Sequence, residues 1–226
     1  MTPEDHATRT GTDHSTGTDH SAGTDHSTDP MRPVPWSAGE WSSRPVSAVQ
    51  DGEALVVRTR SGGDWWRETS YGFVHDDGHA LLVPLPDPGA VEVEFRAQLP
   101  ELYDQAGLML RADARTWLKA GIEQTDGSWH LGAVVTLGLS DWSLAPVPQW
   151  SGQAVTVRAS RSGGAVTVRA RVEGGPWRTV RLAPFPQGVP VFAGPMCCSP
   201  QGPGTTVRFT RFVLGPPDAD LHTPPA

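Results

Sequence analysis

The chain has 226 residues and a formal net charge of −7, and its charged residues of both signs are spread along the sequence. Surfaces that bind nucleic acid need a basic stripe along the phosphate backbone, so we expect no nucleic-acid partner. No run of about 18 apolar residues is present, so we expect no membrane span and no membrane partner. The length suits one all-β domain of about 200 residues with short additional segments.

The first residues, MTPEDHATRT, contain neither the basic segment nor the apolar segment of a secretory signal. The two cysteines, Cys197 and Cys198, are adjacent, and neighbouring side chains of a strand point to opposite faces. A bond between them would be strained, so we predict two free thiols, which fit a reducing compartment. We therefore expect a cytoplasmic protein, with export by a route that needs no signal left open.

Residues 1–30 contain the six-residue units GTDHST, GTDHSA and GTDHST. These units hold no large apolar side chain, so they cannot bury enough surface to offset the entropy of ordering. We predict a disordered leader over residues 1–30. Imidazole and carboxylate are competent metal ligands, and His14, His20 and His26 each follow an aspartate, but a repeat with nothing to pack against provides no fixed geometry. We therefore predict no metal site and no cofactor.

The folded domain is predicted over residues 31–215, and its first part consists of short strands. Residues 54–59 (ALVVRT) lie between two glycine-containing turns. DWWRETSYGFV and HALLVPL flank Asp76-Asp77-Gly78, which predicts a hairpin with its turn at these residues. In residues 91–98 (VEVEFRAQ) apolar and charged side chains alternate, which indicates one buried and one solvated face.

The central and C-terminal parts continue this pattern. Strands are predicted near 105–112, 116–124, 128–137 and 139–143, with Asp126-Gly127 as a tight turn. The two AVTVRA segments, at 154–159 and 165–170, are interpreted as the arms of one hairpin, and TTVRFTRFVLG as a last strand beside an early one. A disordered polar tail without core residues is predicted over 216–226.

No segment shows a sustained helical period with caps at both ends, so we expect few and short helices. About a dozen short strands separated by glycine and proline turns are typical of an all-β fold. We predict a two-sheet antiparallel β-sandwich of the jelly-roll kind.

The central strands have two different faces. Leu108, Leu110, Leu118, Ala120 and Ile122 fall on one side, which we predict to face the core. The other side is polar, charged and aromatic, with residues from Gln105 to Glu123 that resemble a ligand-binding surface. The alternative is a solvated face on which Lys119 and Glu123 form an ordinary charge network.

Several segments also resemble a known family: DWWRETSYGF, YDQAGLMLRAD, WLKAGIE, VVT followed by SDWS, and GPMCCSP. They are similar to the bacterial and fungal family of unknown function that contains the yeast "regulation of enolase" protein, over residues 34–214. The resemblance implies a concanavalin A-like fold of the lectin/glucanase superfamily. It also implies carbohydrate binding on the concave face of one sheet, and a possible protein partner. The Glu-x-Asp-x-x-Glu motif of the laminarinase-type hydrolases is absent, and so are lectin-type calcium and manganese loops.

Sugars are bound by an aromatic plane together with planar polar groups. On the polar face, Trp117 would supply the aromatic plane. The segment Asp64 to Tyr71 would contribute further polar groups, with Trp65 or Trp66 in the core. His75 and His79 flank a turn, where their spacing does not predict a metal site. The predicted ligand-binding residues are Glu68, Tyr71, Gln105, Arg111, Trp117, Lys119, Glu123, Thr136, Asp141 and Trp142.

Three functions remain open from the sequence. The favoured one is binding of a carbohydrate or a related small polar ligand, without catalysis. The second is a glycan-active hydrolase that uses Glu123 with Glu68, Asp104 or Asp141, since hydrolysis needs two suitably spaced carboxyl groups. The third is a protein-interaction module that regulates a metabolic enzyme.

Overall fold

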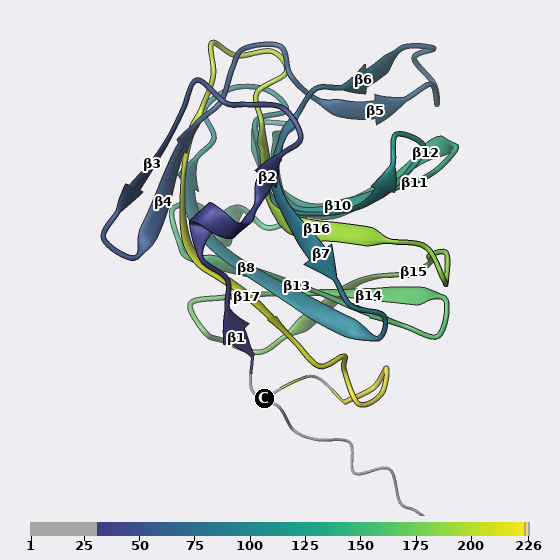
Figure 1. Ribbon diagram of the computed structural model, residues 1–226. Coiled ribbons are helices and arrows are strands. Elements are labelled where there is room, and N and C mark those ends of the chain that lie inside the picture. Colours follow the sequence, from purple (N-terminus) through teal and green to yellow (C-terminus); the bar gives the residue numbers. More distant parts are fainter. Residues whose placement is uncertain (1–30, 224, 226) are drawn as a thin grey trace, which may run out of the picture.

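The computed structural model describes residues 31–223 and 225 of the chain (Figure 1). The predicted leader of residues 1–30, with its histidine repeat, lies outside the described residues. Within them, regular structure consists of β-strands and two three-residue 3-10 helices, η1 (Trp36–Ala38) and η2 (Pro148–Trp150). No helix in this part of the chain is long and apolar enough to cross a membrane.

The eight-stranded antiparallel sheet has the order β15-β14-β13-β8-β17-β4-β3, with β1 paired to β17. Its strands are β1 (Arg32–Pro33), β3 (Ser47–Asp51), β4 (Ala54–Arg58), β8 (Gly89–Gln98), β13 (Val155–Ser162), β14 (Ala165–Val172), β15 (Arg178–Pro184) and β17 (Thr206–Gly215). The two AVTVRA segments are the paired strands β13 and β14. The last strand, β17, lies between β8 and the early strand β4, as predicted.

The seven-stranded antiparallel sheet has the order β12-β11-β10-β9-β16-β7-β2. Its strands are β2 (Glu40–Trp41), β7 (His79–Leu85), β9 (Gln105–Asp113), β10 (Thr116–Thr125), β11 (Ser128–Leu137), β12 (Leu139–Pro146) and β16 (Val191–Cys198). The two sheets pack face to face in Figure 1, which confirms the predicted all-β, two-sheet antiparallel sandwich.

The main core lies between the sheets and is built by alternation. Leu118, Ala120 and Ile122 of β10 point into it, as do Leu108 and Leu110 of β9. The opposite face of the same strands holds a second, smaller apolar cluster. The adjacent cysteines divide between the two, with Cys197 in the main core and Cys198 in the second cluster, and both are free thiols.

The predicted hairpin around Asp76-Asp77-Gly78 is wrong. Residues 64–76 instead form their own small hairpin, in which β5 (Trp65–Arg67) pairs with β6 (Val74–Asp76). β7 pairs with β16 and β2, because joining the large sheet buries more of its apolar side chains than pairing with the short β6 would. The β5–β6 hairpin projects over the face of the seven-stranded sheet that turns away from the eight-stranded sheet (Figure 1).

The segment after β17 differs from the polar tail expected from the sequence. Arg158 and Arg169 lie directly opposite each other on β13 and β14, and both are buried. The Asp218 carboxylate accepts hydrogen bonds from Arg158 Nε at 2.7 Å and from Arg169 Nε at 3.0 Å. Two guanidinium groups side by side repel each other, so Asp218 is held against the sheet by the need for a counter-charge.

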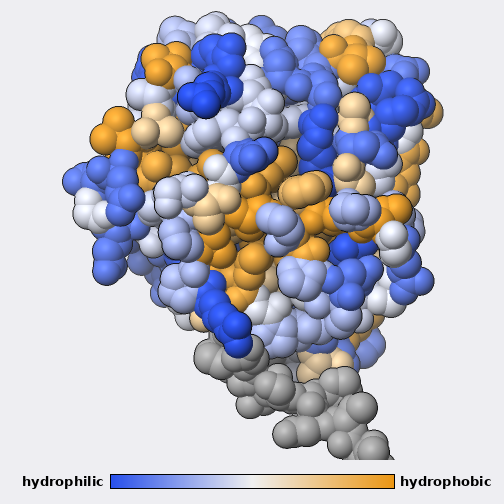
Figure 2. Space-filling view, in the orientation of Figure 1, coloured by the Kyte–Doolittle hydropathy of each residue, from blue (hydrophilic) through white to orange (hydrophobic). Residues whose placement is uncertain are grey.

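On the face shown in Figure 2, apolar side chains gather in the middle, where β2 and β7 lie in Figure 1, and hydrophilic ones surround them. Trp36 and Trp41, which belong to the segment before β3, pack against the main core as partly buried residues. The N-terminal described segment therefore covers one side of the sandwich.

Candidate binding cleft

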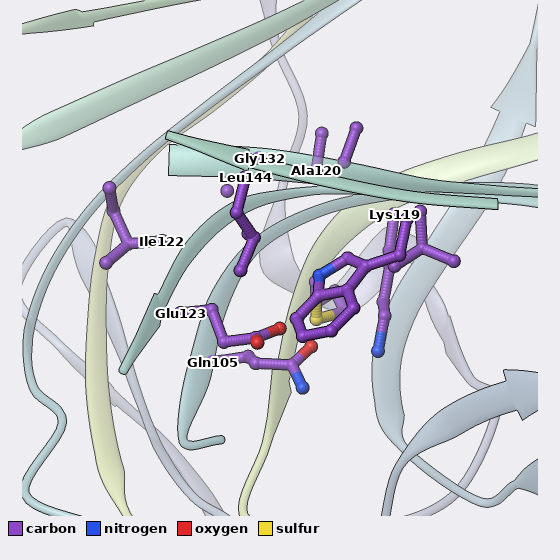
Figure 3. A pocket seen from close by; sticks show the side chains of 12 residues that line it. Gln105, Lys119, Ala120, Ile122, Glu123, Gly132 and Leu144 are labelled. Carbon is purple, nitrogen blue, oxygen red and sulfur yellow. The ribbon is translucent and has the colours of Figure 1, made fainter. Parts of the chain in front are cut away.

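The floor of the candidate site is the outer face of β9, β10, β11 and β12. The antiparallel pairing of these strands arranges the side chains of the floor in rows that run across the sheet, because residues opposite one another share a face. Lys119 on β10 is opposite Met109 on β9 and Val134 on β11, and Val134 is opposite Trp142 on β12. Four residues along β10, Glu123 is opposite Gln105 on β9 and His130 on β11. Figure 3 shows Gln105, Lys119 and Glu123 on one side of the sheet and Ala120 directed to the other.

A row of glycines separates the Lys119 row from the Glu123 row. Gly107, Gly121 and Gly132 are opposite one another on β9, β10 and β11. A Cβ atom on Gly121 would clash with the Ala106 carbonyl oxygen, so only glycine fits the close approach of these strands. The row leaves a recess of about 20 Å³ beside Gln105, Glu123 and Trp142, large enough for one water molecule.

The β5–β6 hairpin is fastened over one part of this floor by Arg111. Its guanidinium donates to both carboxylate oxygens of Asp76, from Nη1 at 2.7 Å and from Nη2 at 2.9 Å. It also lies 4.7 Å from the ring centre of Trp65, a cation–π contact. Trp65 in turn packs on Trp117, and neither indole is exposed to solvent. Arg111 and Trp117 therefore hold the hairpin in place.

The other side of the hairpin is fastened to β12. Ser140 Oγ accepts a hydrogen bond from the Arg67 backbone N–H at 2.9 Å, and Thr136 Oγ1 lies 2.8 Å from the same hydroxyl. Arg67 Nε donates to the Gly138 carbonyl oxygen at 3.2 Å. Thr136 thus supports the position of the hairpin through Ser140.

Aromatic side chains from three segments form a continuous wall. Trp66 contacts Tyr71 and Trp142 edge to face, at ring-centre distances of 5.6 Å and 6.1 Å. Tyr71 stacks on Phe73 at 5.3 Å, and Tyr103 meets Trp142 at 6.5 Å. Tyr71, Phe73 and Trp142 are exposed, which is unusual for large aromatic side chains gathered in one place and typical of a binding surface.

Floor, hairpin and wall enclose a cleft of about 220 Å³. It combines apolar and aromatic walls with a few polar groups, the usual make-up of a small-molecule site. Its lining residues are Gly62, Asp64, Trp66, Tyr71, Phe73, His75, Tyr103, Gln105, Lys119, Glu123, Val134, Trp142, Pro200 and Gln201.

Lys119 is buried in the floor and has a charged partner. Its Nζ donates to Asp64 Oδ1 at 2.8 Å, and Gln105 Nε2 donates to the same oxygen at 3.4 Å. Burial acts to lower the pKa of Lys119, but Asp64 and the neighbouring Cys198 and Glu123 outweigh it, so the net effect is a raised pKa. Lys119 is therefore a fixed cation, neutralised mainly by Asp64.

Glu123 is different, because it is 7% exposed and its Oε1 has no hydrogen-bond partner. Burial raises the pKa of Glu123 to about 7, with Lys119 acting in the opposite direction and Asp64 in the same one. An unpartnered buried carboxyl oxygen costs free energy in a folded protein, and such atoms call for a functional explanation.

Of the predicted ligand-binding residues, the structure brings five to the cleft: Tyr71, Gln105, Lys119, Glu123 and Trp142. Trp117 does not line it and is covered by Trp65, so it cannot present a stacking plane. Glu68 points to Arg67, with Oε1 3.3 Å from Arg67 Nη2, and Asp141 pairs with Arg181 of the other sheet at 2.6 Å. Arg111 and Thr136 hold the hairpin, as described above.

The predicted ligand-binding residues did not include Asp64, Trp66, Phe73, His75 and Tyr103, which also line the cleft. The signal present was the density of aromatic and acidic residues between Asp64 and His75. Their placement depends on the hairpin folding back over the sheet, which no local pattern predicted. Among residues 31–223 and 225, no three His, Cys, Asp or Glu side chains come together as a metal site.

The profile of the family described as "Protein of unknown function (DUF1349)" matches residues 41–217. The chain belongs to this family. It is 38% identical over 181 residues to Regulation of enolase protein 1 of Saccharomyces cerevisiae, a match that covers 80% of this chain and 91% of the yeast protein. The resemblance seen in the sequence motifs is thereby confirmed.

Two solved structures are similar to this chain. A functionally unknown protein from Saccharomyces cerevisiae is 37% identical, with a TM-score of 0.77, and the match covers 81% of this chain and 99% of that one. A mutant of the GH43 protein BlXynB from Bacillus licheniformis matches with a TM-score of 0.63 at 10% identity, over 82% of this chain and 38% of its own. At that identity the second likeness shows the β-sandwich fold alone.

Proposed function

We propose that this DUF1349 protein binds a carbohydrate or a related small polar metabolite in the cleft between the β5–β6 hairpin and β9 to β12. The observation that carries the proposal is the unpartnered Oε1 of Glu123, which lies in the floor of a cleft walled by Trp66, Tyr71 and Trp142. Hydroxyl groups of a sugar would supply the missing hydrogen bond, while the aromatic wall packs against the C–H face of the ring.

The test is a glycan and oligosaccharide binding screen on the full chain, with Trp142→Ala as the site variant. Trp142 is 37% exposed, so its truncation should remove wall surface with little effect on folding. Phe192→Ala is the matched control, because Phe192 is an equally exposed aromatic of the same sheet outside the cleft. The proposal predicts that only Trp142→Ala loses binding. Equal affinity in both variants, or no hit with the wild type, would contradict it.

A second candidate is glycoside hydrolysis. The favouring observation is that Glu123 shares the cleft with a second carboxyl group, Asp64, and that Gln105 lies between them as the β9 partner of Glu123 and the donor to Asp64. The second carboxylates predicted from sequence, Glu68, Asp104 and Asp141, do not line the cleft. Protonated Glu123 would donate its proton to the leaving oxygen, while ionised Asp64 would accept a proton from the water that adds to the sugar carbon.

Incubating a bound oligosaccharide with wild type and Glu123→Gln separates binding from hydrolysis. Release of reducing ends by the wild type alone supports the second candidate, and stable binding without release supports the first.

A third possibility, a protein partner, is supported by the name of the yeast relative, which concerns regulation of enolase. Co-purification of tagged chain with enolase would support it.

A further inference from the structure

The charged residues that line the cleft floor do not neutralise one another. Lys119 and Asp64 form a bonded pair at 2.8 Å, and their side chains are 5% and 17% exposed. Glu123 is left as the acid without a bonded counter-ion or donor at Oε1. When Glu123 is ionised, the floor therefore has one uncompensated negative charge.

The wall favours a positive ligand for an independent reason. Trp66, Tyr71, Phe73 and Trp142 present ring faces and edges around the opening, and aromatic faces attract cations. Aromatic enclosures bind ammonium groups in proteins, and a buried carboxylate beside the enclosure adds an opposite charge. A neutral sugar would use the rings but leave the charge of Glu123 unmatched.

The recess along the glycine row has the right size for such a group. It holds about 20 Å³ and is bordered by Gln105, Glu123 and Trp142. This space suits a group as small as water, and a primary ammonium is of that size. A bulkier substituent, such as an acetamido group, is larger than this space, which Gly121 and Gly132 also border.

We propose that the cleft selects sugars that carry a primary ammonium group, and that this ammonium binds Glu123 Oε1. This inference rests on the proposed function. The groups that face Glu123 are Lys119 on its own strand, Asp64 and Tyr103 from loops, His130 on β11 and Cys198 on β16. Lys119 is neutralised by Asp64. Burial raises the pKa of the Cys198 thiol well above its ordinary value, so the thiol carries no charge.

The test compares three trisaccharides with the same β-1,4 linkage: the glucosamine trimer, the N-acetylglucosamine trimer and the glucose trimer. Calorimetric titration of the full chain at neutral pH should show the glucosamine trimer binding roughly ten- to hundredfold tighter, because a hydrogen bond to a charged group adds that much.

Glu123→Gln should reduce this preference for the glucosamine trimer to a few-fold, because the amide carries no charge to pair with the ammonium. Glu68→Gln is the control. Glu68 belongs to the β5–β6 hairpin, but its carboxylate points to Arg67 and does not line the cleft. Thermal unfolding of both variants checks their folding.

The outcomes separate the two proposals. If the wild type binds all three trimers equally, or prefers a neutral one, the ammonium inference fails and the proposed function stands. A preference that survives Glu123→Gln, or that falls equally in Glu68→Gln, overturns the role of Glu123. No binding of any trimer, together with no hit in the wider glycan screen, overturns both proposals.

Discussion

Lys119 and Glu123 lie four residues apart on the same face of β10, yet Lys119 Nζ is bonded to Asp64 Oδ1 and Glu123 Oε1 has no partner. The charge network on this face is therefore completed by the segment that precedes the β5–β6 hairpin. Glu123 is therefore the group whose protonation most directly makes the stability and the ligand binding of the cleft depend on pH.

Replacement of Glu123 by Gln should change how stability depends on pH. The pKa of Glu123 rises from 4.5 to about 7 on folding, so the folded protein holds a proton that the unfolded chain releases between these values. The free energy of unfolding of the wild type therefore falls as pH rises from about 4.5 to about 7. Above that range the variant should be more stable by about 3 kcal/mol, and at lower pH the two should converge. Urea denaturation of both proteins across this pH range measures the difference in their free energies of unfolding. A difference that does not change with pH would contradict the prediction.

Replacement of Asp64 by Asn should destabilise the protein by leaving Lys119 as a buried cation without a counter-ion. Loss of one partner of a buried pair costs several kcal/mol, and because Asp64 is partly exposed we expect about 2 to 3 kcal/mol. Adding Lys119→Met should recover much of the loss, because the double variant buries no unpaired charge. A double-mutant cycle by chemical denaturation measures the coupling, and additive losses would argue against the pair.

Replacement of Gly121 by Ala should prevent the close approach of β9 and β10. The added Cβ would clash with the carbonyl oxygen of Ala106, a backbone atom that cannot move away alone. We expect a loss of about 3 kcal/mol or more, at the upper end of the cost of overpacking. Gly152→Asn is the control, because a Cβ there meets nothing within 4 Å and Asn tolerates the positive φ. Thermal unfolding compares the two, and equal melting temperatures would contradict the prediction.

Replacement of Asp218 by Ala should destabilise the eight-stranded sheet. It leaves Arg158 and Arg169 buried opposite each other, with only Arg158 still paired to an acid, Glu92, among the ion pairs of Asp218 and Glu92 with these two arginines. Removing the acid from such a buried group costs about 3 to 5 kcal/mol. Asp220→Ala, two residues further along and fully exposed, should have little effect. Denaturant midpoints of the two variants test this, and similar values would show that the segment after β17 does not stabilise the sheet.

Much of the fold was predictable because alternation is a local property. Leu118, Ala120 and Ile122 occupy the core for the same reason that Lys119 and Glu123 occupy the other face: successive side chains of a strand point to opposite sides. Turn chemistry was equally informative at Asp126 and Gly127, whose positive φ angles fit a tight hairpin turn.

Prediction failed where a contact joins residues far apart in the chain. Trp117 follows the correct face, but alternation cannot reveal that Trp65, which lies 52 positions earlier, covers it. Asp141 and Thr136 were placed near the site for their polarity, yet Asp141 binds Arg181 and Thr136 supports Ser140. A polar group satisfied inside the protein and one reserved for a ligand look the same in a sequence.

The sequence by itself determined the sandwich, the two faces of its central strands and the family, because each depends on local periodicity, turns and ordered motifs. Only the tertiary structure decided that the polar face is a buried floor, that the β5–β6 hairpin and Trp142 wall it, and that Lys119 is neutralised by Asp64 while Glu123 is not. The physical reason is that burial and charge pairing depend on which distant segments come into contact, and short hairpins are positioned by such contacts more than by their own residues.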